Sequence, residues 1–299
     1  MAIEFRQTMT KQATEHLFER ALEESIKDSE SDERWDIVGE LGKRDLEVVF
    51  AQASKWCISS KWIERELGAD LLVLGRQEGK SFVYPKKVET KPILEQLLID
   101  LRPEVIASAI YTANHLDLSL ELLDTRMDLA KHESPHVRRA MASSIDTLEP
   151  TDQGIEMLLL LMADEDGDTR DWATFSVGTQ TDIDNPGIRE ALLARLYDPH
   201  DDTHAEAVGG LARRGDERVI PAIKQRFEEA LQQDEWDLGS AWLEAATEIA
   251  APELLSYLEA MVEDGEIDID LNHAIRRCRG EVSPDGVVYG LQPAEKGQD

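Results

Sequence analysis

The chain has 299 residues, of which 62 are acidic and 32 are basic, and its formal net charge is -30 at pH 7. This length allows a large apolar core, and the charge disfavours general nucleic-acid binding because the phosphate backbone would be repelled. The charge favours a partner with a basic surface, although high solubility or a halophilic way of life would explain it as well.

The first segment, residues 1–32, alternates charged and apolar residues, and we expect it to form a capping helix. It contains no apolar stretch long enough for a signal peptide or a membrane span. The two cysteines, Cys57 and Cys278, lack the spacing of a metal site, so we expect buried thiols in a reducing compartment. These features predict a cytoplasmic protein without a membrane partner.

Internal repeats dominate the chain between residues 33 and 264. Three segments align so that Val137, Thr169 and Thr203 share one position, with a period of about 33 residues. Ile145, Val177 and Leu211 then share a second position, and the same pattern fits segments around Trp35, Ile63, Val105 and Leu238. A fixed period of this size is typical of stacked helical units. The sequence therefore predicts an all-α fold, an α-solenoid of about six or seven two-helix repeats.

Each repeat has the same internal plan. An apolar helix such as "GIEMLLLLMA" is followed by a short acidic turn and by a second helix rich in Ala and Gly. The small residues allow close helix packing, and the aspartates of "DEDGD" and "DPHDD" are suited to capping the second helix. We expect the second helices to line the concave side of the solenoid.

An insertion at residues 76–91 interrupts the repeats. Gly79, Pro85 and a short β-prone run predict a loop or a short hairpin there. The insertion also carries a cluster of basic residues, which would either contact an acidic partner or fold back on acidic neighbours. This cluster consists of Arg76, Lys80, Lys86, Lys87 and Lys91.

The chain after the repeats has two parts. Residues 265–279 contain "DLNHAIRRC" and predict a second capping helix. Residues 280–299 combine Pro, Gly and charge without a period, so we expect a disordered tail.

The segments "VRRAMASSI", "TRDWATFSVGTQ", "REALLARLYDP" and "EAVGGLARRGD" resemble bacterial HEAT-repeat proteins, of the kind grouped with the HEAT-like repeats of phycobilin lyases. The resemblance covers roughly residues 33–260. Arg138 and Arg170 occupy the place of the usual Val-Arg arginine, whereas Ile106 and His204 replace it in other repeats. The resemblance implies HEAT-like units, but its members range from scaffolds to chromophore lyases, so it does not fix an activity.

Two strings look like metal motifs. His132 to His136 matches H-E-x-x-H, but Pro135 and the repeat alignment place it on a turn, where the two histidines cannot share one helix face. Asp164, Asp166 and Asp168 resemble a calcium loop, yet Phe175 stands where the last ligand should be. The chain also lacks a phosphate-binding loop and a nucleophile elbow. We therefore expect no cofactor, no metal and no ordinary catalytic constellation.

Polar residues on the second helices that the repeat core does not need are the candidates for partner binding. Trp172 is one of them, and it would be either a packing residue or an exposed anchor. The full set is Glu64, Arg65, Glu66, Asp70, Asn114, His115, Arg139, Asp171, Trp172 and Gln180.

The sequence therefore predicts a non-catalytic interaction scaffold whose acidic concave surface binds a basic protein, for example by neutralising a toxin as immunity proteins do. The alternative is a lyase or modifying enzyme, similar to bilin lyases, that holds a ligand in the groove. A DNA-lesion enzyme would need a basic concave face, and the chain offers little material for one outside the insertion.

Overall fold

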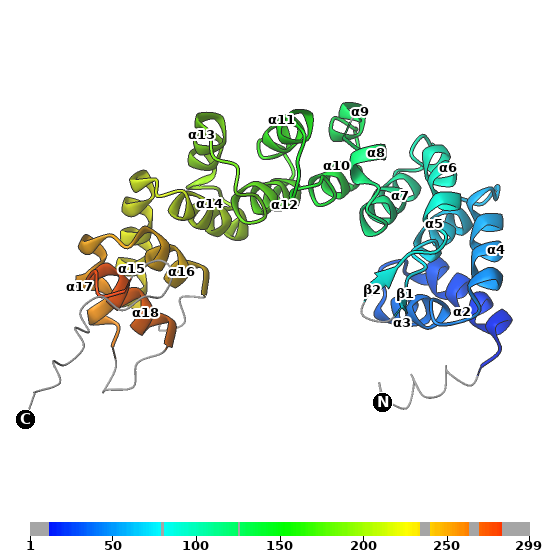
Figure 1. Ribbon diagram of the computed structural model, residues 1–299, viewed down its shortest axis with the longest axis horizontal. Helices are drawn as coiled ribbons and strands as arrows, with labels where there is room; N and C mark the ends of the chain where they lie inside the picture. The colour runs from blue at the N-terminus through cyan, green and yellow to red at the C-terminus, as the bar shows by residue number, and fades with distance from the viewer. Residues whose placement is uncertain (1–11, 79–80, 125, 234–239, 263–268, 283–299) are drawn as a thin grey trace, which may run out of the picture. The chain divides into compact units, whose positions relative to one another are not determined.

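The computed structural model describes residues 12–78, 81–124, 126–233, 240–262 and 269–282. In this part of the chain nearly every element is a helix, and a single two-stranded hairpin interrupts them (Figure 1). The chain divides into two compact units, Met1–Met157 and Leu158–Asp299. The predicted all-α solenoid of two-helix repeats is confirmed.

Unit 1 is built from α2 to α10. The second helices of its repeats, α5, α7 and α10, pack side by side in chain order (Figure 1). Helix α4 packs against α5, and α6 packs against α7. Its elements are α2 (Thr14–Lys27), α3 (Asp32–Leu41), α4 (Leu46–Cys57), α5 (Trp62–Leu71), β1 (Arg76–Glu78), β2 (Ser81–Val83), α6 (Lys87–Leu97), α7 (Pro103–His115), α8 (Ser119–Leu122), α9 (Met127–Ala130) and α10 (Pro135–Ala142). Helix α11 (Asp152–Leu161) spans the boundary between the units.

Unit 2 repeats the same plan. Its second helices, α12, α14, α16 and α18, pack against one another in chain order. Its elements are α12 (Gly167–Gly178), α13 (Pro186–Arg195), α14 (Asp201–Arg213), the 3-10 helix η1 (Glu217–Val219), α15 (Ile220–Gln233), α16 (Ser240–Ile249), the 3-10 helix η2 (Pro252–Leu254), α17 (Leu255–Ala260) and α18 (Ile269–Cys278).

The core of both units lies at the repeated positions. Val137, Thr169 and Thr203, which the repeat alignment equates, are all fully buried. The second equated set, Ile145, Val177 and Leu211, is buried as well. The sequence period therefore reflects one packing layer that recurs from unit to unit.

Glycines bring neighbouring helices into backbone contact. A Cβ atom added to Gly210 of α14 would lie 2.8 Å from the Cα atom of Gly178 in α12. At Gly68 of α5, an added Cβ would lie 2.9 Å from the carbonyl oxygen of Ala53 in α4. These distances are below van der Waals contact, so the predicted role of the small residues is confirmed at both places.

An arginine at the start of the second helix holds the preceding turn. Arg170 Nη1 donates to the carbonyl of Asp164, six residues earlier, at 2.9 Å, and Arg138 Nη1 donates to the carbonyl of His132 at 2.9 Å. Arg65 Nη1 makes the same bond to Ser59, also at 2.9 Å. Arg65 therefore corresponds to Arg138 and Arg170, and the predicted alignment through Ile63 is wrong by one residue.

The acidic turns cap the helices only in part. Asp166 accepts a hydrogen bond from the backbone N–H of Thr169 at 2.9 Å, as predicted. In the turn before α14, however, the imidazole of His200 takes the capping place and accepts from Thr203 N–H at 3.5 Å. The aspartate of that turn, Asp198, instead receives two bonds from Arg170, at 2.9 and 2.8 Å. The prediction of aspartate caps is therefore wrong for α14.

The insertion contains the predicted hairpin, with Arg76 paired to Val83 in antiparallel register. Its irregular part is shorter than predicted, because α6 already begins at Lys87. Three of its lysines bind the chain's own acceptors. Lys86 Nζ lies 2.8 Å from Glu47, Lys87 Nζ donates to the carbonyl of Asp117 at 2.9 Å, and Lys91 pairs with Glu121. For Lys86 and Lys91 the fold-back on acidic neighbours is confirmed, whereas Lys87 binds a backbone carbonyl and Lys80 lies outside the described residues.

Other predictions meet the structure only in part. Residues 1–32 contain α2, and residues 265–279 contain α18. Most of the predicted tail at 280–299 lies outside the described residues, as does Leu238. Cys57 and Cys278 are buried as free thiols, as predicted. No helix in the described part of the chain is long and apolar enough to cross a membrane.

Candidate functional site

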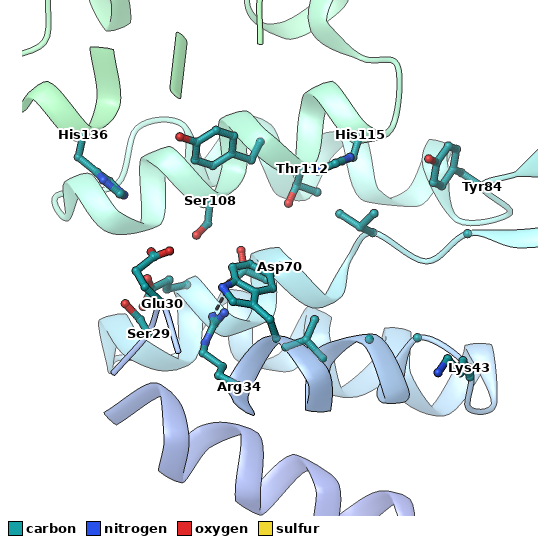
Figure 2. A pocket seen from close by; sticks show the side chains of 18 residues that line it. Ser29, Glu30, Arg34, Lys43, Asp70, Tyr84, Ser108, Thr112, His115 and His136 are labelled. Atoms are coloured by element: carbon teal, nitrogen blue, oxygen red, sulfur yellow. Dashed lines mark hydrogen bonds and ion pairs between the residues drawn. The ribbon is translucent and has the colours of Figure 1, made fainter. Parts of the chain in front are cut away.

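A cavity of about 690 Å³ lies within unit 1, between α3, α5 and α7. In Figure 2, Ser108 and Thr112 of α7 face Arg34 of α3 and Asp70 of α5 across this space, with His136 at one end and Tyr84 at the other. We call it the α3–α5–α7 cavity. Its size and its mixed polar and aromatic wall are those of a ligand site.

A buried ion pair forms the floor of the cavity. Arg34 follows the capping residue Ser31, and its side chain is 0% exposed. Its Nε donates to Ser25 Oγ of α2 at 2.8 Å, and its Nη2 bonds the Asp70 carboxylate. Ser108 of α7 also hydrogen-bonds Asp70. The ion pair of Arg34 and Asp70 thus links α2, α3, α5 and α7. Its guanidinium would be costly to bury without these partners.

Two buried ionisable groups at the floor of the cavity, one of them Arg34 itself, are not fully bonded. Arg34 Nη1 and Glu66 Oε2 have no hydrogen-bond partner among the described residues, and both residues line the cavity. Glu66 is 4% exposed, and burial together with the nearby charge of Asp70 raises its pKa to about 7. Unbonded buried charges are costly, and they mark this wall as a place where a ligand would supply the missing partners.

Aromatic side chains form the remaining wall, and an empty space lies beside α3. The indole of Trp35 is 44% exposed, and the Arg34 guanidinium lies 4.6 Å from the centre of its ring. Tyr111 also lines the cavity, and burial raises the pKa of its phenol. A Cβ atom added at Gly39 of α3 would meet no atom within 4 Å, so the space in front of this residue is empty.

A second depression, of about 420 Å³, lies in unit 2 along α14, α16 and α18. Its carboxylates come from three neighbouring second helices: Glu206, Glu244, Glu248 and Asp270. Glu244, Glu248 and Asp270 are exposed. The one arginine in its wall, Arg213, donates to Thr179 Oγ1 at 2.7 Å. We call this depression the acidic groove, because its carboxylates give it a negative potential.

Helix α12 carries Asp171 and Trp172. Burial and the neighbouring Asp202 raise the pKa of Asp171 to about 6. The indole of Trp172 is 42% exposed and lies edge-on to Phe175, with ring centres 6.0 Å apart. Trp172 is therefore not a core residue, and its role as a binding anchor stays a prediction.

The structure brings only some of the predicted partner-binding residues together. Glu66, Asp70 and His115 line the α3–α5–α7 cavity. Glu64 pairs with Lys61 at 2.7 Å, and Arg65 pairs with Asp100 at 2.7 Å, so both have structural partners. The others lie on second helices or at their ends: Asn114 and Gln180 are exposed, and Arg139 is half-buried.

Sequence reasoning missed Arg34, Trp35, Ser108 and Tyr111, which complete the cavity. One signal was available for Arg34. It precedes the core residues Ile37 and Leu41 by one and two helical turns, which places a charge on the buried face of α3. A charge at such a position needs a partner elsewhere in the fold.

The motif His132–His136 lies only partly on the predicted turn, because its last two residues already belong to α10. His132 Nδ1 accepts from Ser134 N–H at 3.0 Å, and Pro135 begins α10, so the two histidines do not share one helix. Within the described ranges, no group of three or more His, Cys, Asp or Glu side chains is placed to hold a metal ion.

Comparison with known proteins supports the fold. No family model matches the sequence. Protein YibA of Escherichia coli K12 is 27% identical over 226 residues, covering 72% of this chain and 75% of YibA, and YibA of strain O157:H7 matches equally well. The crystal structure of E. coli YibA superposes with a TM-score of 0.72 at 23% identity, over 93% of this chain and 96% of YibA. The chain thus has the helical-repeat fold of YibA.

Proposed function

We propose that this chain is a non-catalytic interaction scaffold whose second helices bind a protein partner with a basic surface. The observation that carries the proposal is the acidic groove of unit 2, where neighbouring second helices present exposed carboxylates to one depression. A surface of this kind attracts basic proteins and raises their rate of encounter.

Two carboxylates of the groove, Glu244 and Glu248, differ from those that hold the fold together. Asp216 accepts from Arg218 and Arg189, and its bonds to Arg218 lower its pKa to about 2. By contrast, no ion pair within the described residues involves Glu244 or Glu248. Carboxylates that are not used to stabilise the fold, and that lie together on one surface, favour a role in binding a partner.

The lyase alternative predicts a pocket with convergent polar groups, and the α3–α5–α7 cavity has that character. Covalent attachment of a ligand would need a reactive nucleophile at its wall. Cys57 does not line the cavity, and burial raises the pKa of its thiol to about 12, which makes it a poor nucleophile. The scaffold proposal is therefore better supported than the lyase alternative.

The test is affinity capture from a lysate of the source cells with three forms of the protein. The first is wild type, and the second is the groove variant Glu206→Gln/Glu244→Gln/Glu248→Gln. The third, Glu15→Gln/Glu23→Gln/Glu95→Gln, removes the same charge from exposed positions on α2 and α6.

We expect the wild-type protein and the control variant to capture a basic protein at 50 mM salt. The groove variant should capture at least about fivefold less of this partner, and 500 mM salt should release the partner from all forms. Equal capture by both variants would show that the groove is not the binding surface. If the captured partner is a toxin or nuclease, inhibition of its activity by the wild-type protein tests the immunity-like version.

A further inference from the structure

We propose that the α3–α5–α7 cavity receives one basic side chain, an arginine of a polypeptide partner, and that Glu66 is its counter-ion. This inference deepens the proposed function, because the arginine would belong to the same basic partner. It concerns unit 1, however, whereas the proposed function rests on the acidic groove of unit 2.

The first argument is the state of Glu66. Its side chain is almost fully buried on α5 at the wall of the cavity, and its Oε2 atom lacks a hydrogen-bond partner in the described part of the chain. A carboxylate in this position is destabilised unless a donor reaches it. A ligand that enters the cavity is the available source of that donor.

The second argument is the balance of charge around the cavity. The guanidinium of Arg34 is matched by Asp70, which it contacts directly. Lys43 at the rim lies 3.3 Å from Glu40. Among the described residues, Glu66 and Glu30 then remain as the acidic groups of the wall without a basic partner, and a cation that enters the cavity would stabilise their charged form. This arrangement favours a cation over an anion.

The third argument is shape. Trp35 and Tyr111 offer aromatic surface in the same cavity as Glu66, and the volume of about 690 Å³ is ample for a long side chain. A planar guanidinium stacks on aromatic rings and donates in a fork to carboxylates, which an ammonium does not. Arginine therefore fits the wall better than lysine.

The experiment uses the full chain and small capped amino acids. N-acetyl-arginine N-methylamide is titrated against the ¹⁵N-labelled protein, and the indole N–H signal of Trp35 is followed by NMR, assigned from a Trp35→Phe spectrum. The neutral isostere N-acetyl-citrulline N-methylamide and the anionic N-acetyl-aspartate N-methylamide are the matched probes. We expect saturable binding of the arginine probe, and at least about tenfold weaker binding of the other two.

Two variants test the site itself. Glu66→Gln keeps the shape of the side chain and should weaken the arginine probe at least about fivefold. Gly39→Leu places a side chain in the empty space in front of α3 and should abolish binding, whereas Ala51→Leu adds a side chain at an exposed position of α4 outside the cavity and should leave it unchanged. Circular dichroism confirms that each variant is folded.

The outcomes separate the two proposals. No binding of the arginine probe, equal binding of the citrulline probe, or unchanged binding to Glu66→Gln would each overturn the inference. Tighter binding of the aspartate probe would show instead that Arg34 makes this an anion site. None of these results touches the capture experiment, in which loss of the partner from the groove variant tests unit 2. Conversely, if the arginine probe binds but no partner is captured, the inference about the cavity is supported and the proposed scaffold function is contradicted.

Discussion

The two units treat buried charge differently. In unit 2, Asp198 is bound by Arg170 and Arg195 and also accepts from the backbone N–H of His200. In unit 1, the pair of Arg34 and Asp70 leaves Arg34 Nη1 unbonded, and Glu66 beside it lacks a donor. The difference shows that the charged groups of a repeat can either be fully bonded within a turn, as in unit 2, or be left without a partner at a cavity wall, as in unit 1.

The contrast is sharpest at one position of the repeat. Glu66 and Asp171 each follow the arginine that holds the preceding turn, Arg65 or Arg170. Burial raises the pKa of both carboxyl groups, to about 7 and about 6. Only Glu66 lines the α3–α5–α7 cavity, where the charge of Arg34 also acts on it.

Removing the central arginine of each unit should give the largest effects. We expect Arg34→Met to lower the free energy of unfolding by about 3–5 kcal/mol, because Asp70 is then buried without a cation. Arg170→Met should cost less, about 1–2 kcal/mol, because Asp198 keeps Arg195 and the His200 N–H. Urea unfolding followed by circular dichroism measures both. A larger loss for Arg170→Met would contradict the comparison.

The glycine contact of unit 2 should give the next effect. Gly210→Ala places a Cβ atom 2.8 Å from Gly178 Cα, so α12 and α14 must separate, and we expect a loss of about 2 kcal/mol. The neighbouring Gly209→Ala is the control, because its Cβ meets only Arg213 Nη2 at 3.9 Å. It should be neutral or stabilise by up to about 1 kcal/mol through helix propensity. Thermal unfolding of both variants decides whether the backbone contact matters.

The raised pKa of Glu66 predicts a dependence of stability on pH. Because the folded carboxyl group keeps its proton up to about pH 7 and the unfolded one loses it near 4.5, stability falls as the pH rises through this window. The charges that act on Glu66 are those of Arg34, Asp70, Glu30 and Glu104. Glu66→Gln should therefore be about 1–2 kcal/mol more stable than wild type at pH 8 and similar to it at pH 5.

Urea midpoints between pH 5 and pH 8 measure this effect, and Asp171→Asn in unit 2 is the comparison variant. We expect a smaller gain for Asp171→Asn, because Asp171 is only half-buried. A wild-type protein that gains stability between pH 5 and pH 7 relative to Glu66→Gln would contradict the unbonded state of Glu66.

The exposed indole of unit 2 should give the smallest change in stability. Trp172→Ala removes one edge contact with Phe175 and should cost less than about 1 kcal/mol. If Trp172 is an anchor, the variant should nevertheless lose most of the partner capture. Leu160→Ala, a similarly exposed apolar residue on α11, is the control and should retain capture. Equal capture by both variants would remove Trp172 from the binding surface.

Much of the fold could be predicted from the sequence, because the core repeats. Val137, Thr169 and Thr203 recur at a nearly constant interval, and each is buried for the same reason. The second repeat was misaligned by one residue because its apolar pattern fits both registers, and only the bond from Arg65 to Ser59 fixes it. The His200 cap was missed since aspartates on both sides looked like better caps.

The candidate site was less accessible to prediction. Glu66, Asp70 and His115 were identified as polar residues that the repeat does not need, and the structure places them at one cavity. Arg34, the partner of Asp70, comes from α3, which the sequence pattern assigns to a different repeat. No spacing in the sequence shows that α3 and α7 face each other across this cavity, so the cavity emerges only from the packing.

The arginines that hold the turns also tie each repeat to the next. Arg65 binds Asp100, and Arg170 binds Asp198, so each guanidinium joins its own turn to the turn of the following repeat. A repeat that frayed alone would strand a nearly buried carboxylate on its neighbour. Adjacent repeats should therefore open together, and amide hydrogen exchange should report paired rather than single repeats as the smallest cooperative blocks of the array.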